Sequence, residues 1–491
     1  MGAFIKYPMK RRFFCFGLFV FSLLVLFFVA GCHKQSQKLN FYQIQVEVDE
    51  ENKVLTCNQS INYHNNSENC LSVVSFFVYA NAFSQDQPAV GAAYLDKAYP
   101  NGESFGLFCL ESVTANGQKA DFCFEKPSIL SVEIGQLWQN ETVQIEMNYT
   151  ISLANINHRL GYGDNTINCG NFFPIACVYE NGQFVKPDFS TNGDPFYSDV
   201  ANFEVKIEHS ADYMLACTGD QTVTNRNEGR VEVFCKADRV RDFCFVLSDK
   251  FECLTDFVED VEVRYYCYNK DNAEHHLKTA TKALSTFEEL FGEYPYKQLS
   301  VVESNFCFGG MEYPNLVLVS DGLADRETVD YVIVHEIAHQ WWYGMVGSNQ
   351  FDHAWQDEGL TELSTALFFE NNPEYGIEYQ QIMQNTTTSY KTFVAVFEKV
   401  VGSVDESMDR KLTDFDTEPE YVSCVYTKGM LMFDWIRSDL GDKKFFKAIK
   451  EYFETFRYEN ASPQDLINTF CKQRNLKKAF ESWLSGKVVV E

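Results

Sequence analysis

The chain has 491 residues, of which 45% are hydrophobic and 15% aromatic, and 69 acidic side chains outnumber 41 basic ones for a formal net charge of −28. This length and hydrophobic content predict two or three domains with sizeable cores and exclude a disordered or low-complexity chain. The negative charge argues against a nucleic-acid partner, which requires a basic face. A solvated acidic surface explains most of the charge, and attraction of cationic or amine-bearing substrates is the alternative.

Residues 1–32 have the pattern of a bacterial export signal. Basic residues at positions 6, 10, 11 and 12 precede an apolar run from Phe13 to Ala30. The run ends in Val29-Ala30-Gly31-Cys32, which resembles a lipobox, so Cys32 would become the lipidated first residue of the mature protein. The alternative is an uncleaved anchor helix, because the run is nearly long enough to span a bilayer. Either way, we expect the remaining chain to lie outside the cytoplasm, anchored to the bacterial cell membrane.

The chain contains sixteen cysteines, a high count for an exported bacterial protein. Cys15 and Cys32 belong to the export segment, and the others are scattered without a CxxC pair, which excludes a zinc finger or a thioredoxin-like motif. Many lie in alternating apolar stretches, as Cys244 and Cys267 do, so buried free thiols in strands are the simplest account. Export permits disulfides, but their pairing does not follow from the sequence.

Residues 33–252 are predicted to form an N-terminal all-β domain, a sandwich or saddle of strands. From about Leu39 to Phe251, apolar residues alternate with polar ones or run over strand lengths, as in QIQVEVD, VQIEMNYTISL and NFEVKIEH. Asn-Gly pairs at positions 101, 116, 181 and 192 mark turns between these strands.

Residues 253–491 are predicted to form an α+β domain with a helical majority. VEVRYYCY, LSVVES and LVLVS have the pattern of strands. HHLKTATKALSTFEELFG carries a helical stripe of apolar residues and ends at a glycine, and the helical period continues through YTKGMLMFDWIRSDLG and FFKAIKEYFETF.

A zinc site is predicted at residues 335–339, which read HEIAH, and at Glu358 after a gap of eighteen residues. On a helix His335 and His339 lie one turn apart on one face, so both imidazoles can bind one Zn²⁺. Two histidines and one carboxylate leave the fourth tetrahedral position open, as a catalytic zinc requires. Glu336 lies beside the metal, where it can take a proton from water. The alternative is a helix with two hydrogen-bonded histidines, but burying these groups among apolar residues is costly without a metal.

Two other segments offer groups that a zinc hydrolase needs. Residues 309–314 read GGMEYP, in which the glycines allow close approach of a substrate backbone and Glu312 can hold a positive group such as a free α-amine. A tight turn before a strand is the alternative. Tyr426 in VYTKGMLMF offers a phenol that can hydrogen-bond a developing oxyanion, and a half-buried helix residue is the alternative.

In their order and spacing, GGMEYP, HEIAHQWW, the Glu of DEGLTE and YTKG resemble the aminopeptidase-N family of zinc peptidases, the gluzincins of peptidase family M1. FYSDVANFEVKIEH and ACTG also resemble its first domain, and YENASPQDLINTF and FESWL its later part, so the resemblance covers roughly residues 40–491. It implies a β-saddle domain, a thermolysin-like catalytic domain with one zinc ion per chain, and cleavage of N-terminal residues from peptides with a free N-terminus. It implies zinc binding by His335, His339 and Glu358, a general base in Glu336, stabilisation of the tetrahedral intermediate by Tyr426, and α-amine binding by Glu312 with Gly309, Gly310 and Met311 beside it.

The chain departs from the family pattern in three places. Tyr313 stands where the family commonly has Asn. The family's QxEA-type motif, which supplies a second amine-binding residue from the β domain, is missing, and Glu180 in CVYENG is a weak candidate for that role. The chain ends at Glu491, where the family usually continues into a helical cap, so we expect a more open cleft.

The leading hypothesis is a membrane-tethered zinc aminopeptidase. A zinc endopeptidase or another hydrolase on the same scaffold is the second hypothesis, and blocking the peptide N-terminus distinguishes the two. A non-catalytic lipoprotein that binds peptides is the third. Glu336 and Tyr426 argue against it, because neither metal binding nor peptide binding alone requires them.

Overall fold

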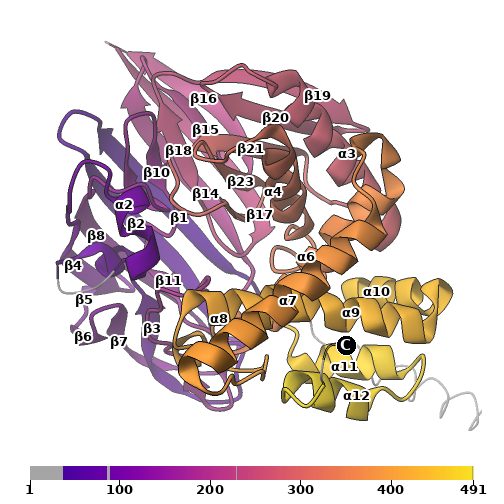
Figure 1. Ribbon diagram of the computed structural model, residues 1–491. Coiled ribbons are helices and arrows are strands. Elements are labelled where there is room, and N and C mark those ends of the chain that lie inside the picture. Colours follow the sequence, from indigo (N-terminus) through magenta and orange to yellow (C-terminus); the bar gives the residue numbers. More distant parts are fainter. Residues whose placement is uncertain (1–36, 86–88, 228, 489, 491) are drawn as a thin grey trace, which may run out of the picture. The chain divides into compact units, whose positions relative to one another are not determined.

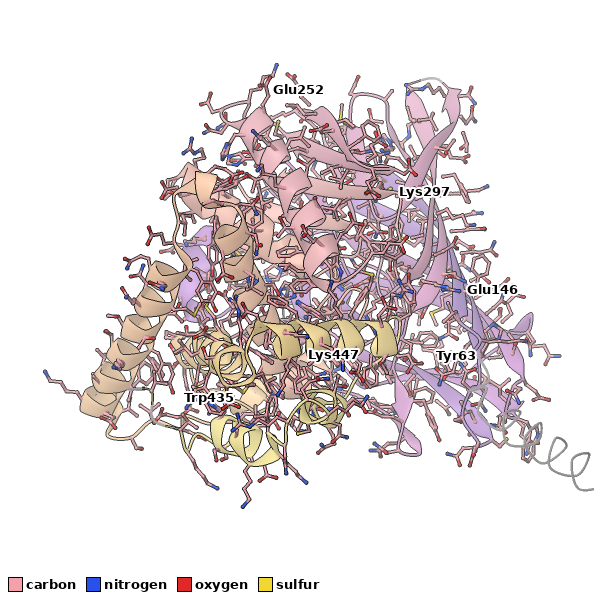
Figure 2. The ribbon with its side chains drawn as sticks, turned by 90° about the vertical axis from the view of Figure 1, so that its right-hand side faces the viewer. Tyr63, Glu146, Glu252, Lys297, Trp435 and Lys447 are labelled. Carbon is pink, nitrogen blue, oxygen red and sulfur yellow. The ribbon has the colours of Figure 1, made fainter. Side chains whose placement is uncertain are left out.

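The largest sheet of the computed structural model has eight strands and comes from residues 40–240 (Figure 1). Its strands alternate as expected: Ile44, Val46 and Val48 are buried, while the residues between them are exposed. Figure 2 shows Glu146 among the side chains that project outward from this sheet. In spatial order the strands are β16 (Asp220–Asn227), β17 (Arg230–Val240), β14 (Ala201–Ser210), β1 (Asn40–Asp49), β2 (Val54–His64), β8 (Thr142–Ser152), β4 (Leu107–Ala115) and β5 (Gln118–Lys119).

Smaller sheets complete the β region. The Asn-Gly pairs at positions 116 and 181 adopt positive φ angles and form tight turns, as predicted. The first pair joins β4 to β5, and the second joins β12 (Tyr179–Glu180) to β13 (Gln183–Phe184). One sheet consists of β11 (Ile175–Ala176), β3 (Leu71–Phe77), β7 (Ile129–Leu137) and β6 (Phe122–Lys126), a second of β15 (Met214–Cys217), β18 (Phe245–Ser248), β10 (Ile167–Cys169) and β9 (Leu160–Tyr162), and a hairpin of β12 (Tyr179–Glu180) and β13 (Gln183–Phe184).

A five-stranded sheet joins the β region to the helices. Val302 and Leu318 on one face belong to the core of the β region, whereas Val301 and Val317 on the other face pack into the core of the helices. Because both faces are covered, almost every residue of its inner strands is buried. The strands are β19 (Glu252–Val258), β20 (Val261–Cys267), β21 (Gln298–Ser304), β23 (Leu316–Ser320) and β22 (Gly310–Met311).

Helices dominate the chain after residue 320, and they lie beside this sheet and below it in Figure 1. α3 follows the predicted apolar stripe and ends at Gly292, whose φ of 138° suits a glycine. Trp435 in Figure 2 marks α9. The β region followed by a helical majority confirms the predicted fold class. The helices are η1 (Tyr79–Phe83), η2 (Ala92–Tyr94), α2 (Leu95–Ala98), α3 (Ala273–Phe291), α4 (Arg326–Ala338), α5 (Gln350–His353), α6 (Trp355–Asn371), η3 (Pro373–Tyr375), α7 (Tyr379–Val401), η4 (Leu412–Asp414), α8 (Glu418–Val422), η5 (Ser423–Thr427), α9 (Lys428–Leu440), α10 (Asp442–Phe456), α11 (Pro463–Cys471) and α12 (Lys477–Leu484).

The structure describes residues 37–85, 89–227, 229–488 and 490. The predicted export segment and Cys32 lie outside them. Within these described ranges, no helix combines the length and apolar character needed to cross a bilayer. The predicted domain boundary between residues 252 and 253 stays a prediction. Leu39–Glu491 forms one compact unit. Each cysteine of the described part is a free thiol. Cys244 and Cys267 are buried as expected, whereas Cys70, Cys109, Cys123 and Cys253 are exposed. Cys217 Sγ and Cys235 Sγ lie 3.1 Å apart.

Candidate metal centre and active site

Three predicted metal ligands meet between α4 and α6. α4 begins after Asp325, whose side chain accepts a hydrogen bond from the backbone of Thr328, and it ends at His339. The Nε2 atoms of His335 and His339 are 3.2 Å apart, and Glu358 Oε2 lies 3.5 Å from the first and 3.2 Å from the second. The ligands of a tetrahedral zinc, bound at roughly 2.0–2.1 Å, are about 3.3 Å from one another. The three donor atoms therefore have the spacing that zinc requires.

The environment of Glu358 also fits a cation. Its Oε2 is buried without a hydrogen-bond partner, although it faces two imidazoles. Burial opposes ionisation, but His339 and His335 outweigh it and lower the pKa of Glu358 to about 2. A buried carboxylate oxygen that faces two imidazole nitrogens has the arrangement of ligands found in metal-binding sites. This set of two histidines and one carboxylate is typical of catalytic zinc and leaves one coordination position for substrate or water.

Neighbouring polar groups orient both histidines. His339 Nδ1 lies 3.0 Å from the carbonyl oxygen of Trp342 and 3.1 Å from the hydroxyl of Thr361. His335 Nδ1 lies 3.4 Å from Glu362 Oε1, and Tyr331 donates to the other oxygen of Glu362. Such contacts set the tautomer and the ring plane of metal-binding histidines. Trp342, Thr361 and Glu362 are thus supporting residues that the sequence analysis did not single out.

Glu336 is packed against the backbone of Gly310. A Cβ atom added at Gly310 would lie 2.3 Å from Glu336 Oε1, so only glycine leaves room for this carboxylate. Glu336 Oε2 is buried without a hydrogen-bond partner. Burial, and then the negative charge of Glu312, raise the pKa of Glu336 well above its usual range. A buried carboxylate that retains a free oxygen and binds a proton more readily than usual suits a general base.

Tyr426 lies in η5, a turn of π-helix between α8 and α9. π-Helical turns inside α-helices are frequent at functional sites. The Tyr426 hydroxyl donates to Glu358 Oε1 at 2.6 Å, and its ring stacks on that of His335 at 6.1 Å between centroids. The structure therefore brings this phenol to the predicted metal ligands.

Glu312 is almost fully buried at 3% exposure. Gln350 Nε2 donates to Glu312 Oε1 at 2.9 Å and to Asp357 Oδ2 at 2.8 Å, so one amide group links the GGMEYP loop to the residue before Glu358. The sequence carries no motif for Gln350. Met311 is buried as well, and its sulfur accepts a hydrogen bond from the guanidinium of Arg159.

A cavity of about 260 Å³ opens onto this centre. Gly309, Gly310 and Glu336 line it, but Met311 and Glu312 do not. The β region contributes Arg159 and Asp194, which form a largely buried ion pair with 7% and 14% side-chain exposure.

Neither Arg159 nor Asp194 was singled out from the sequence, in which Asp194 belongs to an ordinary Asn-Gly-Asp turn. Glu180, the sequence candidate for a second amine-binding residue, is exposed on β12, accepts a hydrogen bond from Tyr197 and does not line the cavity. The negative charges of Glu312 and Glu358 act on Asp194, so the β region does supply an acidic group near the centre.

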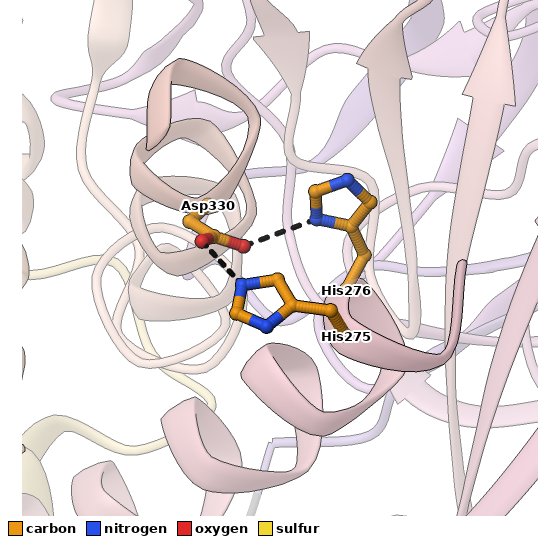
Figure 3. Close-up of side chains that lie close together, drawn as sticks. All are labelled: His275, His276 and Asp330. Carbon is orange, nitrogen blue, oxygen red and sulfur yellow. Dashed lines mark hydrogen bonds and ion pairs between the residues drawn. The ribbon is translucent and has the colours of Figure 1, made fainter. Parts of the chain in front are cut away.

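Asp330, His275 and His276 form a second group of potential metal donors in the described part of the chain (Figure 3). His275 Nε2 lies 2.7 Å from Asp330 Oδ2, and His276 Nδ1 lies 3.0 Å from Asp330 Oδ1. These are hydrogen-bond distances, shorter than the separation of zinc ligands. Thr279 also donates to Asp330, and although burial opposes it, these hydrogen bonds lower the pKa of Asp330. The group therefore joins the first turn of α3 to α4, the helix of the HEIAH motif.

Comparison with known proteins agrees with this geometry. Residues 275–483 match the model of the peptidase family M1 domain. Over 237 residues the chain is 28% identical to Aminopeptidase M1-A of Oryza sativa subsp. japonica, which covers 45% of this chain and 26% of that protein. Over 313 residues it is 25% identical to Leucine aminopeptidase 2 of Yarrowia lipolytica, which covers 60% of this chain and 46% of that protein. The chain thus spans less than half the length of either relative.

The fold has a close counterpart among solved structures. The M1 zinc metallopeptidase from Deinococcus radiodurans superposes with a TM-score of 0.65 over 92% of this chain and 94% of that protein, at 16% identity. A mutant of that protein bound to a Tyr-Ser-Ala substrate gives a TM-score of 0.64. These matches confirm the resemblance found in the sequence: the chain carries a peptidase family M1 domain within the two-domain fold of the M1 zinc metallopeptidases.

Proposed function

We propose that this protein is a zinc-dependent aminopeptidase that removes N-terminal residues from peptides. The observation that carries the proposal is the spacing of the three donor atoms of His335, His339 and Glu358, with the free oxygen of Glu336 beside them. The names of the relatives, which are aminopeptidases, support the same reaction. The Tyr-Ser-Ala peptide bound to the Deinococcus radiodurans protein supports a peptide substrate.

The residues of the centre divide the chemistry among them. His335, His339 and Glu358 would hold a zinc ion, which would supply a Lewis acid able to polarise a carbonyl and lower the pKa of water. Glu336 takes a proton from water on its free Oε2 and delivers it to the nitrogen of the departing amine. The Tyr426 hydroxyl, which donates to Glu358, can donate instead to the peptide carbonyl oxygen as negative charge develops there.

Selection of the peptide end requires an acidic group that meets the α-ammonium. We assign this role to Glu312, which Gln350 holds in place, together with Asp194 from the β region. Asp194 lines the cavity but already balances the charge of Arg159, and Glu312, which does not line the cavity, adds its negative charge from behind the lining residues. Two carboxylates near the cavity favour a substrate with a free amine over one with a blocked end.

Hydrolysis of aminoacyl amides by the full-length protein in detergent tests this function. We expect cleavage that a chelator abolishes and zinc restores, and that Glu336→Gln reduces by several orders of magnitude without loss of bound metal. N-acetylation of the same substrates should abolish cleavage. Zinc binding without cleavage of any free-amine substrate would contradict the proposal, and equal cleavage of acetylated peptides would favour an endopeptidase.

We further propose that the protein is a bacterial lipoprotein attached to the outside of the cell membrane through Cys32. The support is the sequence of residues 6–32, with basic residues, an apolar run and a terminal Val-Ala-Gly-Cys. Labelling of producing cells with a radioactive fatty acid should mark the protein, and Cys32→Ser should abolish the label and release the chain. Cys15→Ser, in the same segment, is the control that should keep the label. Label that persists in Cys32→Ser would refute this attachment.

A further inference from the structure

The cavity extends beyond the metal centre along one continuous helical path. Glu418 opens α8, and Tyr426 follows eight residues later in η5; both line the cavity. Eight residues of helix rise about 12 Å. Tyr421 and Val422 line the stretch between them. The cavity therefore has a reactive end at Tyr426 and a second end at Glu418.

Aromatic rings from two other segments line the cavity beside Glu418. Tyr94, in η2 of the β region, packs edge-on against Phe308, which precedes the GGMEYP loop, with ring centroids 4.6 Å apart. Both residues line the cavity. Lys97 Nζ already lies 5.8 Å from the centroid of the Tyr94 ring, and Arg159 Cζ lies 5.8 Å from that of Phe308. The rings therefore offer apolar surface for the aliphatic stem of a long side chain, and the charged end requires an acidic partner.

Glu418 differs from the other acidic residues that line the cavity. Glu336 is the proposed base, Glu362 contacts His335 and Tyr331, and Asp194 is paired with Arg159. Among the described side chains, the hydrogen bond to Glu418 comes from an uncharged phenol, that of Tyr94, and reaches only Oε1. The second oxygen of this half-buried carboxylate is free to bind a ligand.

We propose that this end of the cavity binds the side chain of the substrate's N-terminal residue and that Glu418 makes it selective for lysine and arginine. The inference rests on the proposed aminopeptidase function. A lysine or arginine side chain spans about 6–7 Å from Cα to its charged end. A residue whose carbonyl meets Tyr426 can extend such a side chain through the cavity toward Glu418, with its stem beside Tyr94 and Phe308. The leucine side chain is shorter, carries no charge and gains no ion pair.

Kinetic measurements on the full-length protein with fluorogenic amides of arginine, lysine, leucine and alanine test the inference. For the wild type we expect kcat/KM for arginine and lysine to exceed that for leucine by about tenfold or more. Glu418→Gln should lower kcat/KM for the basic residues by roughly 10- to 100-fold, the range for loss of a charge-assisted contact, and leave leucine within about threefold. Asp416→Asn is the matched control: it removes an exposed charge two residues away, outside the cavity lining, and should change none of the four values by more than about threefold.

Inhibition by free amino acids gives a second readout that does not depend on turnover. L-Arginine should inhibit the wild type more strongly than L-norleucine, and Glu418→Gln should remove this difference; Glu418→Asp should retain part of it. A wild type without preference for basic residues, or an equal loss for arginine and leucine in Glu418→Gln, would overturn the inference and leave the proposed function intact. Failure of the wild type to cleave any of the four amides would overturn the proposed function itself, and the inference with it.

Discussion

Replacement of Gly310 by alanine should displace the general base without disturbing the metal. The added Cβ would lie 2.3 Å from Oε1 of Glu336, 2.5 Å from Cδ and 2.6 Å from Cγ. Ordinary contact begins near 3.4 Å, so the carboxylate or the loop must move by about 1 Å. A misplacement of this size in a catalytic group costs about 100-fold in rate, or about 2.7 kcal/mol of activation free energy. We therefore expect kcat to fall about 100-fold in Gly310→Ala.

Gly309→Ala provides the matched control. Both glycines line the cavity, but a Cβ at Gly309 would meet only Val332 Cγ2, at 3.6 Å, which is an ordinary contact. Neither glycine has a positive φ, so backbone strain affects neither variant. Steady-state kinetics, metal analysis and thermal unfolding should show lost turnover in Gly310→Ala alone, with one zinc per chain in both variants. A kcat within threefold of wild type in Gly310→Ala, or an equal loss in Gly309→Ala, would refute the reasoning.

Four other perturbations follow from the same geometry. Tyr426→Phe should lower kcat by about 10²–10³-fold in steady-state assays and leave KM within a few-fold; loss of metal would instead point to its hydrogen bond with Glu358. Glu312→Ala should remove most activity on free-amine peptides, as product analysis would show; cleavage of these peptides at the wild-type rate would exclude an amine anchor. Removal of the metal by a chelator should lower the midpoint temperature of unfolding, because a ligand present at 100 times its Kd stabilises the folded state by about 2.7 kcal/mol. An unchanged midpoint would show that no bound metal stabilises the fold. Asp330→Asn should destabilise the fold by about 1–3 kcal/mol near neutral pH. Because the folded state lowers the pKa of Asp330, the stabilisation by its carboxylate is present above about pH 4 and disappears as the pH falls below it. Urea unfolding of both proteins at pH 7 and pH 3 can measure this difference.

The parts of the centre that could be predicted depend on local spacing. His335 and His339 lie one turn apart on any helix, so their proximity follows from the motif alone. The strands of the β region could likewise be predicted from their local alternation of apolar and polar residues. Tyr426 could be identified only as a candidate, because its local pattern is that of a half-buried helix residue. Its contact with Glu358 arises from the packing of η5 on α6, to which no local pattern points.

The residues that escaped prediction come from segments distant in the chain. Arg159, Asp194 and Glu418 lie far apart in sequence, and each belongs to a stretch with no motif of its own. The β region brings the first two to the cavity, and α8 brings the third. Glu180 was only a weak candidate, and the β12–β13 hairpin exposes it. An acidic residue outside a motif becomes a binding group only through long-range contacts, and local sequence patterns do not predict these contacts.

Gly310 shows how the correct residue can be identified for an incomplete reason. The sequence predicts it as a place where a substrate backbone approaches closely. In the structure the closest group is the protein's own Glu336, which occupies the space that any other side chain would fill. The GGMEYP loop and the HEIAH helix therefore constrain each other: the glycine is required because the base is there, and the base is held in place by the loop backbone. A change in either segment should alter the other's function, so that Gly310→Ala and Glu336→Asp, which shortens the base by one methylene group, should be less damaging together than the sum of their separate effects.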